Sequence, residues 1–286
     1  MRYRFIDMQR RQYPVAVLCT MLGVSRAGYY AWRRRPPSAR AGANAALREQ
    51  IQTAYEAGRG SYGYRRVHAA VARHVPCSRN RVARQMRHMG MRARRNRQYK
   101  TTTRANPDRP VAPNRLNREF VASAPDRKWL SDITYVPTVE GWLYLAVVLD
   151  LYARRVVGWA LAPRLKEELT LSALKMALGR RAVGAGLLHH SDQGSQYTSH
   201  KYRRLLAKNK VITSMSRRGN AYDNAPMESF FATLKSELVT HCHFQTRDQA
   251  RRAIFEYIEV FYNRQRLHSA LSYRSPVEFE ALFRPT

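Results

Sequence analysis

Apolar residues recur at helical spacing near the start of the chain. In the run VAVLCTMLGVSRAGYYAWRRR, from Val15 to Arg35, they lie on both sides of Gly23, and Ser25 stands where it can cap a second helix. Two prolines at positions 36 and 37 then end that helix. The pattern predicts two helices joined by a short turn, as in a helix-turn-helix.

A second helical region is expected between about Ala45 and Gly90. Its middle piece, GSYGYRRVHAAVARH, has apolar residues at helical spacing, and Ser78 stands before a helix that should end at Gly90. Residues 91–114 then contain few apolar residues and three prolines, which is typical of a linker.

The spacing changes to that of strands from Trp129 onward. KWLSDITYVPT, GWLYLAVVLDLYA and RRVVGWALA predict an antiparallel meander, and the helical run EELTLSALKMAL follows. Residues 186–190 and 211–215 predict two further strands. A later helix has its apolar residues on one stripe: Met227, Phe230, Phe231, Leu234 and Leu238. The order of strands and helices favours an α/β fold.

These patterns divide the chain into five expected parts. The first two are small all-α helix-turn-helix domains, the third is a basic linker, the fourth is catalytic and the fifth is a C-terminal extension. Their expected bounds are 1–40, 41–92, 93–118, 119–262 and 263–286.

Positive charge is concentrated in the first third of the chain. The 286 residues carry a formal net charge of +31; residues 1–104 contain 24 Lys and Arg against three acids, a net of +21. Solubility does not require so large an excess, whereas binding to a polyanion explains it. No apolar run approaches the length of a membrane span, and the three cysteines form no disulfide pattern. We therefore expect a cytoplasmic DNA-binding protein with no membrane partner.

Two basic helices are the candidate DNA-contacting elements. The first is the second helix of the N-terminal pair, and the second is the Arg-rich helix that follows Ser78. A packing hairpin and a solvated charged face are the respective alternatives. The candidate DNA contacts in these parts and the linker are Arg26, Tyr29, Tyr30, Arg33, Arg65, Arg66, Arg79, Arg81, Arg84, Arg87, Arg94 and Arg95.

Three acidic residues occur in or beside apolar runs, where a solvated surface position does not account for a charged side chain. Asp132 lies inside an apolar strand, and Asp192 directly follows another. Glu228 lies near the start of the later helix, and Lys235, seven residues on, returns to almost the same face. Half-buried carboxylates are costly unless they are paired or bind a cation, so each is a candidate functional residue, with a hydrogen-bonded structural acid as the alternative.

The segments WLSDITYV, HSDQGSQYTS and NAPMESFFATLKSEL resemble the three motifs of the Asp-Asp-Glu transposases and retroviral integrases. Thirty-five residues separate Asp192 from Glu228, as in the insertion-sequence branch of this superfamily, and Lys235 matches its basic position. The tail YNRQRLHSALSYRSPVEFE and the tandem helix-turn-helix units resemble the catalytic second-reading-frame protein of one large bacterial insertion-sequence family.

The resemblance implies a ribonuclease-H-like catalytic domain with a mixed five-stranded sheet. It also implies a catalytic triad of Asp132, Asp192 and Glu228. Oxygen ligands of this kind suit two Mg²⁺ ions, with Mn²⁺ as a substitute, that assist in-line displacement at phosphorus. Near the scissile phosphate we expect Gln193, Asn220, Asn224 and Lys235.

Three further features are assigned to structure rather than chemistry, or left open. His190 either orients the phosphate or is a satisfied strand histidine. Asp150 is left outside the triad and is expected to pair with Arg154 or Arg155. The cluster at positions 241–243 has no second pair at zinc-finger spacing.

The sequence therefore predicts a transposase that binds the terminal inverted repeats of its element, cleaves them and joins them to target DNA. A nuclease of the same fold and a DNA-binding repressor with an inactive catalytic domain are the alternatives. The expected partners are double-stranded DNA, further copies of the chain in a synaptic complex, and a small upstream reading-frame protein. We expect the protein in the bacterial nucleoid.

Overall fold

The computed structural model describes residues 1–93, 112–217 and 221–283. These residues belong to two compact units, 1–52 and 53–286. Most of the predicted linker, including Arg94 and Arg95, and the candidate Asn220 lie outside the described residues.

The first unit begins with three short helices around a small core. They are α1 (Arg2–Gln9), α2 (Val15–Met21) and α3 (Arg26–Arg34). Gly23 has a φ of +59° in the turn between α2 and α3, and the Ser25 side chain accepts a hydrogen bond from the Gly28 N–H at 3.0 Å. The predicted helix pair and its cap are confirmed.

Tyr29 does not face solvent, although its sequence position suggested a DNA contact. Its side chain is fully buried with Ile6, Leu18 and Cys19, and its hydroxyl donates to Asp7 at 2.8 Å. The helical repeat places Tyr29 on the apolar stripe of α3, so it packs the core while Arg26 and Tyr30 remain exposed.

Three further helices precede the sheet. They are α4 (Ala39–Ala57), α5 (Tyr64–Val71) and α6 (Arg79–His88). Ser78 caps α6 by accepting from the Arg81 N–H, and Gly90 has a φ of +68° just after the helix, as the sequence predicted. Within the second unit, the Tyr62 hydroxyl accepts a hydrogen bond from the Leu267 N–H at 2.8 Å, and Arg59 pairs with Glu256.

A mixed sheet of five strands forms the centre of the second unit. Its strands are β1 (Lys128–Val136), β2 (Leu143–Asp150), β3 (Arg155–Ala162), β4 (Leu188–Ser191) and β5 (Ile212–Met215). Their order is β3-β2-β1-β4-β5. The first three strands pair antiparallel, whereas β1 with β4 and β4 with β5 pair parallel. The predicted meander and the mixed five-stranded α/β class are confirmed.

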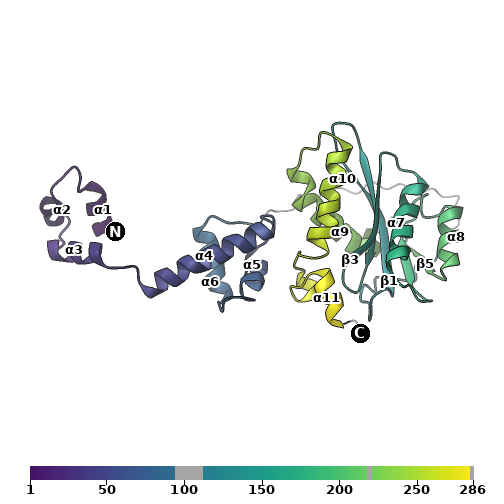
Figure 1. Cartoon of the computed structure of the whole chain (residues 1–286), viewed down its shortest axis with the longest axis horizontal. Coiled ribbons are helices and arrows are strands. Elements are labelled where there is room, and N and C mark those ends of the chain that lie inside the picture. Colours follow the sequence, from purple (N-terminus) through teal and green to yellow (C-terminus); the bar gives the residue numbers. More distant parts are fainter. Residues whose placement is uncertain (94–111, 218–220, 284–286) are drawn as a thin grey trace. The chain divides into compact units, whose positions relative to one another are not determined.

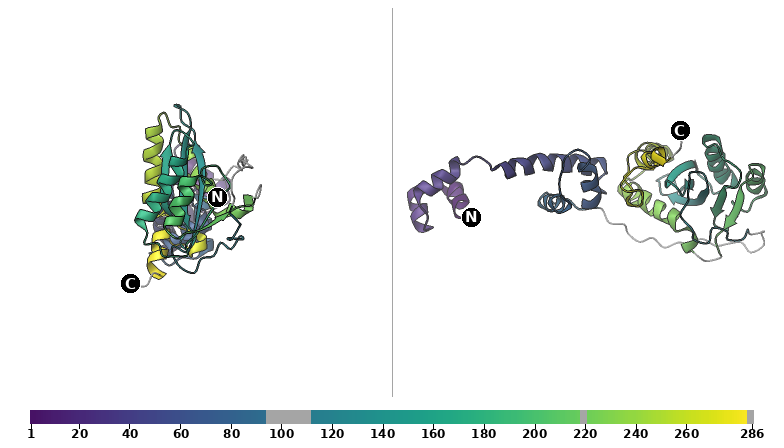
Figure 2. Two further views of the ribbon diagram at one scale, coloured as in Figure 1. Left: turned by 90° about the vertical axis from the view of Figure 1, so that its right-hand side faces the viewer. Right: turned by 90° about the horizontal axis from the view of Figure 1, so that it is seen from below.

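Helices cover both faces of this sheet (Figure 1). On one side α7 (Glu167–Arg180) and α8 (His200–Lys208) enclose a core around Trp129 and Leu174. On the other, α9 (Ala225–Glu237) and α10 (Arg247–Phe255) enclose a larger core around Leu130 and Leu234, and Figure 2 shows the same layers from two further sides. The predicted apolar stripe of α9 is buried. None of the described helices has the length and apolar composition needed to cross a bilayer.

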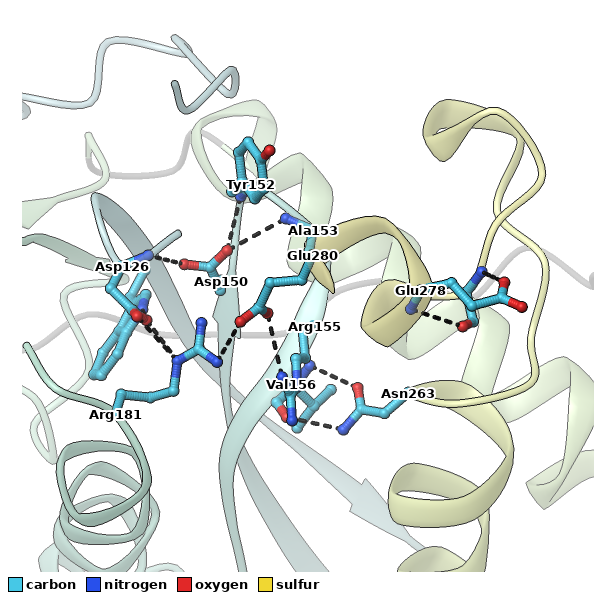
Figure 3. Close-up of polar contacts among 12 residues, drawn as sticks. Asp126, Asp150, Tyr152, Ala153, Arg155, Val156, Arg181, Asn263, Glu278 and Glu280 are labelled. Carbon is cyan, nitrogen blue, oxygen red and sulfur yellow. Dashed lines mark hydrogen bonds and ion pairs between the residues drawn. The ribbon is translucent and has the colours of Figure 1, made fainter. Parts of the chain in front are cut away.

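The C-terminal segment packs into the second unit through buried polar contacts (Figure 3). Glu280, on α11 (Pro276–Phe283), binds the Arg181 guanidinium at 2.7 Å, and Arg181 also binds Asp126 at 2.8 Å. The exposed fractions of the Arg181, Asp126 and Glu280 side chains are only 5%, 8% and 3%. Asn263 adds two hydrogen bonds to the backbone of Val156. The C-terminal stretch is therefore held within the second unit by buried polar contacts.

The expected pairing of Asp150 with Arg154 or Arg155 is wrong. Asp150 is fully buried and accepts hydrogen bonds from three backbone N–H groups: Asp126, Tyr152 and Ala153 (Figure 3). Arg155 binds Glu280 instead. Asp150 thus ties the β2–β3 turn to the segment before β1, and burial raises its pKa to about 6.

Replacing Glu280 with Gln is expected to lower the free energy of unfolding by about 3 kcal/mol, because Arg181 then keeps one buried carboxylate instead of two. Urea denaturation measures the loss. The control is Glu119→Gln, which removes the ion pair between Glu119 and Lys128 at the surface, where the Glu119 side chain is 76% exposed. The expected loss for this variant is below about 1 kcal/mol. Equally small losses of unfolding free energy in the two variants would show that the ion pairs of Arg181 with Asp126 and Glu280 do not hold α11 in place.

Candidate active site

The register of two parallel strands brings Asp132 and Asp192 together. Ser131 of β1 pairs with Ser191, the last residue of β4. Asp132 and Asp192 directly follow these two residues and therefore occupy matching positions. Paired residues of neighbouring parallel strands point to the same face, and adjacent strands lie about 4.8 Å apart. Two carboxylates that are 60 positions apart in the sequence therefore face the same side of the sheet as neighbours.

Asn224 connects the Glu228 helix to this pair. Asn224 directly precedes α9, is buried, and donates a hydrogen bond from its Nδ2 to the Asp132 Oδ2 at 3.0 Å. Glu228 lies in the first turn of α9, and this helix packs against β1. The start of α9 is thus held at the strand that carries Asp132.

Asp223 holds the segment before α9 in place. It is fully buried, and its carboxylate accepts hydrogen bonds from Arg217, Arg118 and Asn114. The hydrogen bonds from Arg217 lower the pKa of Asp223 well below its usual range. The Asn224 side chain makes no cap hydrogen bond to α9 and binds Asp132 instead.

Burial and mutual repulsion disfavour the ionised forms of the three acids in the metal-free protein. Burial, reinforced by the charge of Asp192 and then of Glu228, raises the pKa of Asp132 to about 8. Burial also raises the pKa of Asp192 and of Glu228. All three side chains remain partly exposed. The arrangement favours any cation that reaches them.

The carboxylate oxygens of Asp132, Asp192 and Glu228 are the kind of ligand that a hard divalent cation prefers. They do not converge on one point, however. Within residues 1–93, 112–217 and 221–283, no three acidic, histidine or cysteine side chains lie close enough together to hold a metal ion. Asp132 Oδ1 accepts from the Ile133 N–H at 2.7 Å, and Asp192 Oδ1 accepts from the Gly194 N–H at 2.9 Å. Asn224 Oδ1 is buried without a hydrogen-bond partner among the described residues. Each carboxylate is thus partly turned to a nearby backbone N–H.

The two histidines of β4 are structural. His190 is fully buried and contacts the hydroxyls of Ser214 and Ser216, at 2.8 and 3.0 Å. Burial lowers the pKa of His190 to about 4, so the ring is neutral at pH 7. Of the two interpretations of His190, the satisfied strand histidine is confirmed. The neighbouring Gln193 donates to the Ser216 carbonyl at 2.9 Å.

The remaining candidate DNA contacts are distributed over both units. In the first unit Arg33 is exposed and also lies 3.4 Å from Asp7. In the second, Arg66 is half-buried and packs over the Tyr62 ring, while the Lys235 ammonium lies 4.9 Å from the centre of the Tyr135 ring. Arg81 is half-buried. The other exposed arginines among these candidates are Arg65, Arg79, Arg84 and Arg87.

Sequence reasoning missed the buried ion pairs of the second unit. Asp126, Arg181 and Glu280 are each ordinary charged residues in sequence, and nothing in their spacing shows that they meet. The same is true of Glu237 and Arg266, which form a buried ion pair at 2.8 Å. The one available signal was the low acid content of the chain, which makes each acid inside an apolar run worth following.

Comparisons with known proteins agree with this geometry. Residues 122–221 and 228–282 each match a family described as Integrase core domain, and residues 43–99 match a family described as HTH-like domain. Among solved structures, the HTLV-2 integrase catalytic core domain in complex with magnesium aligns with a TM-score of 0.44 and 15% identity, over 56% of this chain and 99% of that chain. The two family matches to residues 122–221 and 228–282 define an integrase-core protein.

The curated relatives are more specific. The chain is 46% identical over 263 residues to an uncharacterized 31 kDa protein of insertion element IS600 from Shigella sonnei, covering 92% of this chain and 97% of the relative. It is 38% identical over 283 residues to transposase InsF of insertion sequence IS3A from Escherichia coli (strain K12), covering 98% of each. The chain belongs to this family of insertion-sequence transposases, which confirms the class predicted from its motifs.

Asp132→Asn is expected to stabilise the metal-free protein. Because the folded pKa of Asp132 is raised, stability falls as pH rises from about 4, where the unfolded side chain ionises, to about 8, where the folded one does. Asparagine removes that loss. Calorimetry with a chelator should show a melting temperature several degrees above wild type at pH 8 and a smaller gain at pH 5.

Asn224 can accommodate the new amide, because rotating its own amide turns the unpartnered Oδ1 towards position 132. A variant that melts at or below the wild-type temperature at pH 8 would contradict the electrostatic interpretation of this site.

Proposed function

We propose that this transposase binds the ends of its insertion sequence, cuts them and joins them to target DNA at a centre formed by Asp132, Asp192 and Glu228. The single observation that supports this most directly is the β1–β4 register, which makes Asp132 and Asp192 neighbours on one face. The hydrogen bond from Asn224 to Asp132 adds the Glu228 helix to the same region.

The proposed cofactor is Mg²⁺, as two ions, with Mn²⁺ as a substitute. Asp132, Asp192 and Glu228 are the residues that would hold these ions. When bound, such ions stabilise the attacking and leaving oxygens of an in-line displacement at phosphorus. Binding requires the Asp132 and Asp192 carboxylates to turn from their backbone N–H partners and Asp132 to lose its proton.

The chain's own groups orient this centre. Asn224 fixes the Asp132 carboxylate through Nδ2, and its unpartnered Oδ1 is available to a bound water or cation. No side-chain nucleophile is required: water as the attacking group gives cleavage, and a DNA 3′-hydroxyl gives joining. The buried His189 and His190 keep β4 in register without taking part in proton transfer.

DNA binding is assigned mainly to the basic helices before the sheet. The exposed Arg26 of α3 and the exposed Arg79, Arg84 and Arg87 of α6 are the proposed contacts there. Lys235 and Gln193 are proposed to act near the reacting phosphate. Because two ends must be held together, the proposed active form is a dimer or larger assembly, with an upstream reading-frame protein as a further partner.

An assay with DNA carrying the terminal repeats tests the proposal. Joined products with Mg²⁺ support transposition, whereas cut products without joining indicate a nuclease of the same fold. A shifted DNA band without any chemistry would indicate a repressor.

Asp192→Asn is expected to reduce cleavage and joining to background, since it removes a proposed metal ligand, while the affinity for end DNA changes less than about twofold. Asp248→Asn is the matched control, because Asp248 has a side chain that is 79% exposed on α10. Wild-type activity of the Asp192 variant would remove Asp192 from the centre.

Arg84→Gln is expected to weaken binding to DNA of any sequence and to lower the salt dependence of the binding constant by about one unit, the effect of one lost phosphate contact. Fluorescence anisotropy over a series of KCl concentrations measures both. An unchanged slope would show that the exposed face of α6 is only a solvated surface.

A further inference from the structure

Two adjoining cavities lie beside the face of α9 that points away from Glu228. The first has a volume of about 340 Å³ and is lined by Arg66, Arg154, Arg266, His268, Ser229 and Tyr262, among others. The second, about 370 Å³, shares Arg66, Thr233 and Arg266 with it. Volumes of this size are at the lower end of those that hold ligands. The shared residues show that the two cavities adjoin each other beside α9.

The charge of these cavities is not balanced by the protein. Arg266 is paired with Glu237, at 2.8 Å. In contrast, Arg66 and Arg154 form no ion pair within the described part of the chain, although the charge of Glu237 acts on Arg66 and that of Asp150 on Arg154, and both arginines are half-buried. Asp150 already accepts three backbone hydrogen bonds. Burial and then the charges of all three arginines lower the pKa of His268 far below its usual range, so the cavity favours an anion.

The backbone at Arg154 gives a second, independent observation. Arg154 ends the turn between β2 and β3 with a φ of +54°, a left-handed conformation in which glycine or asparagine is usual. An arginine there costs free energy that glycine would not. Arg154 thus combines a strained backbone conformation with a side chain that places positive charge in the cavity.

The position of the cavities relates them to the proposed function. Ala225 and Pro226 line the first one, and the preceding residue is Asn224, which binds Asp132. Resting on the proposed transposase activity, we propose that these cavities bind the phosphate backbone of DNA next to the reacting strand, with Arg66 and Arg154 as the contacts. Two adjoining cavities suit successive phosphates of one strand better than a single free phosphate, and the hydroxyls of Ser229 and Thr233 supply further donors.

Arg154→Gly separates this role from a structural one. Glycine relieves the left-handed strain, so the variant should melt at or above the wild-type temperature. Its binding to a DNA duplex of arbitrary sequence should weaken, and the slope of log affinity against log salt concentration should fall by about one unit. Arg154→Gln, which keeps the strain and removes the charge, should lose the same slope. The matched control is Arg203→Gln on the exposed surface of α8, which should keep the wild-type slope.

The outcomes are distinct. If both Arg154 variants keep the wild-type slope, or if Arg203→Gln lowers it equally, the assignment is overturned. A different outcome is that inorganic phosphate raises the melting temperature of the wild type but not of Arg154→Gly, while the two proteins show the same salt dependence of DNA affinity. In that case the cavity binds free phosphate and the DNA assignment is overturned. Joining by the wild-type protein tests the proposed function separately, so its failure is not confused with failure of this inference.

Discussion

Electrostatic repulsion between Asp132 and Asp192 is the constraint on which the site depends. The parallel pairing of β1 with β4 forces the two carboxylates to be neighbours on a half-buried face, with Glu228 adding to their negative field. A fold gains no stability from such an arrangement, because each charge is desolvated and its neighbour repels it. The raised pKa of Asp132 expresses this cost. A bound cation would relieve this repulsion, so the site favours a cation and the phosphates that accompany it.

Buried polar contacts elsewhere in the second unit offset that cost to stability. His189 contacts the Ser131 hydroxyl at 2.8 Å, directly beside the Asp132 position, and His190 contacts two serine hydroxyls of the next strand. Farther away, the Arg181 network fastens α11 and the Glu237–Arg266 pair fastens the segment after α10. Removing one partner from a buried pair costs several times more than losing a surface pair. Both segments are therefore held within the second unit by buried ion pairs.

Positive charge takes two forms in this protein. A large part of it lies on exposed arginines of the helices before the sheet, where it suits sequence-independent contact with DNA. A smaller part is half-buried beside α9, where Arg66 and Arg154 form no ion pair among the described residues. Exposed charge is screened by salt and adapts to many ligands, whereas charge in a cavity selects an anion at one place. The chain thus combines broad attraction to DNA with positions suited to individual phosphates.

The sequence alone determined the elements and the class of this protein. Helical and alternating apolar spacing predicted α2, α3, α6, the β1–β3 meander and the buried stripe of α9, because such periodicity depends on local geometry and on which face meets the core. The three acids could also be selected from their local contexts and motif spacing. Only the tertiary structure decided which groups meet: Asn224 with Asp132, Asp150 with three backbone N–H groups instead of an arginine, and Tyr29 with a core instead of DNA. Such contacts join residues far apart along the chain, and their partners depend on strand register and helix packing, which local sequence does not encode.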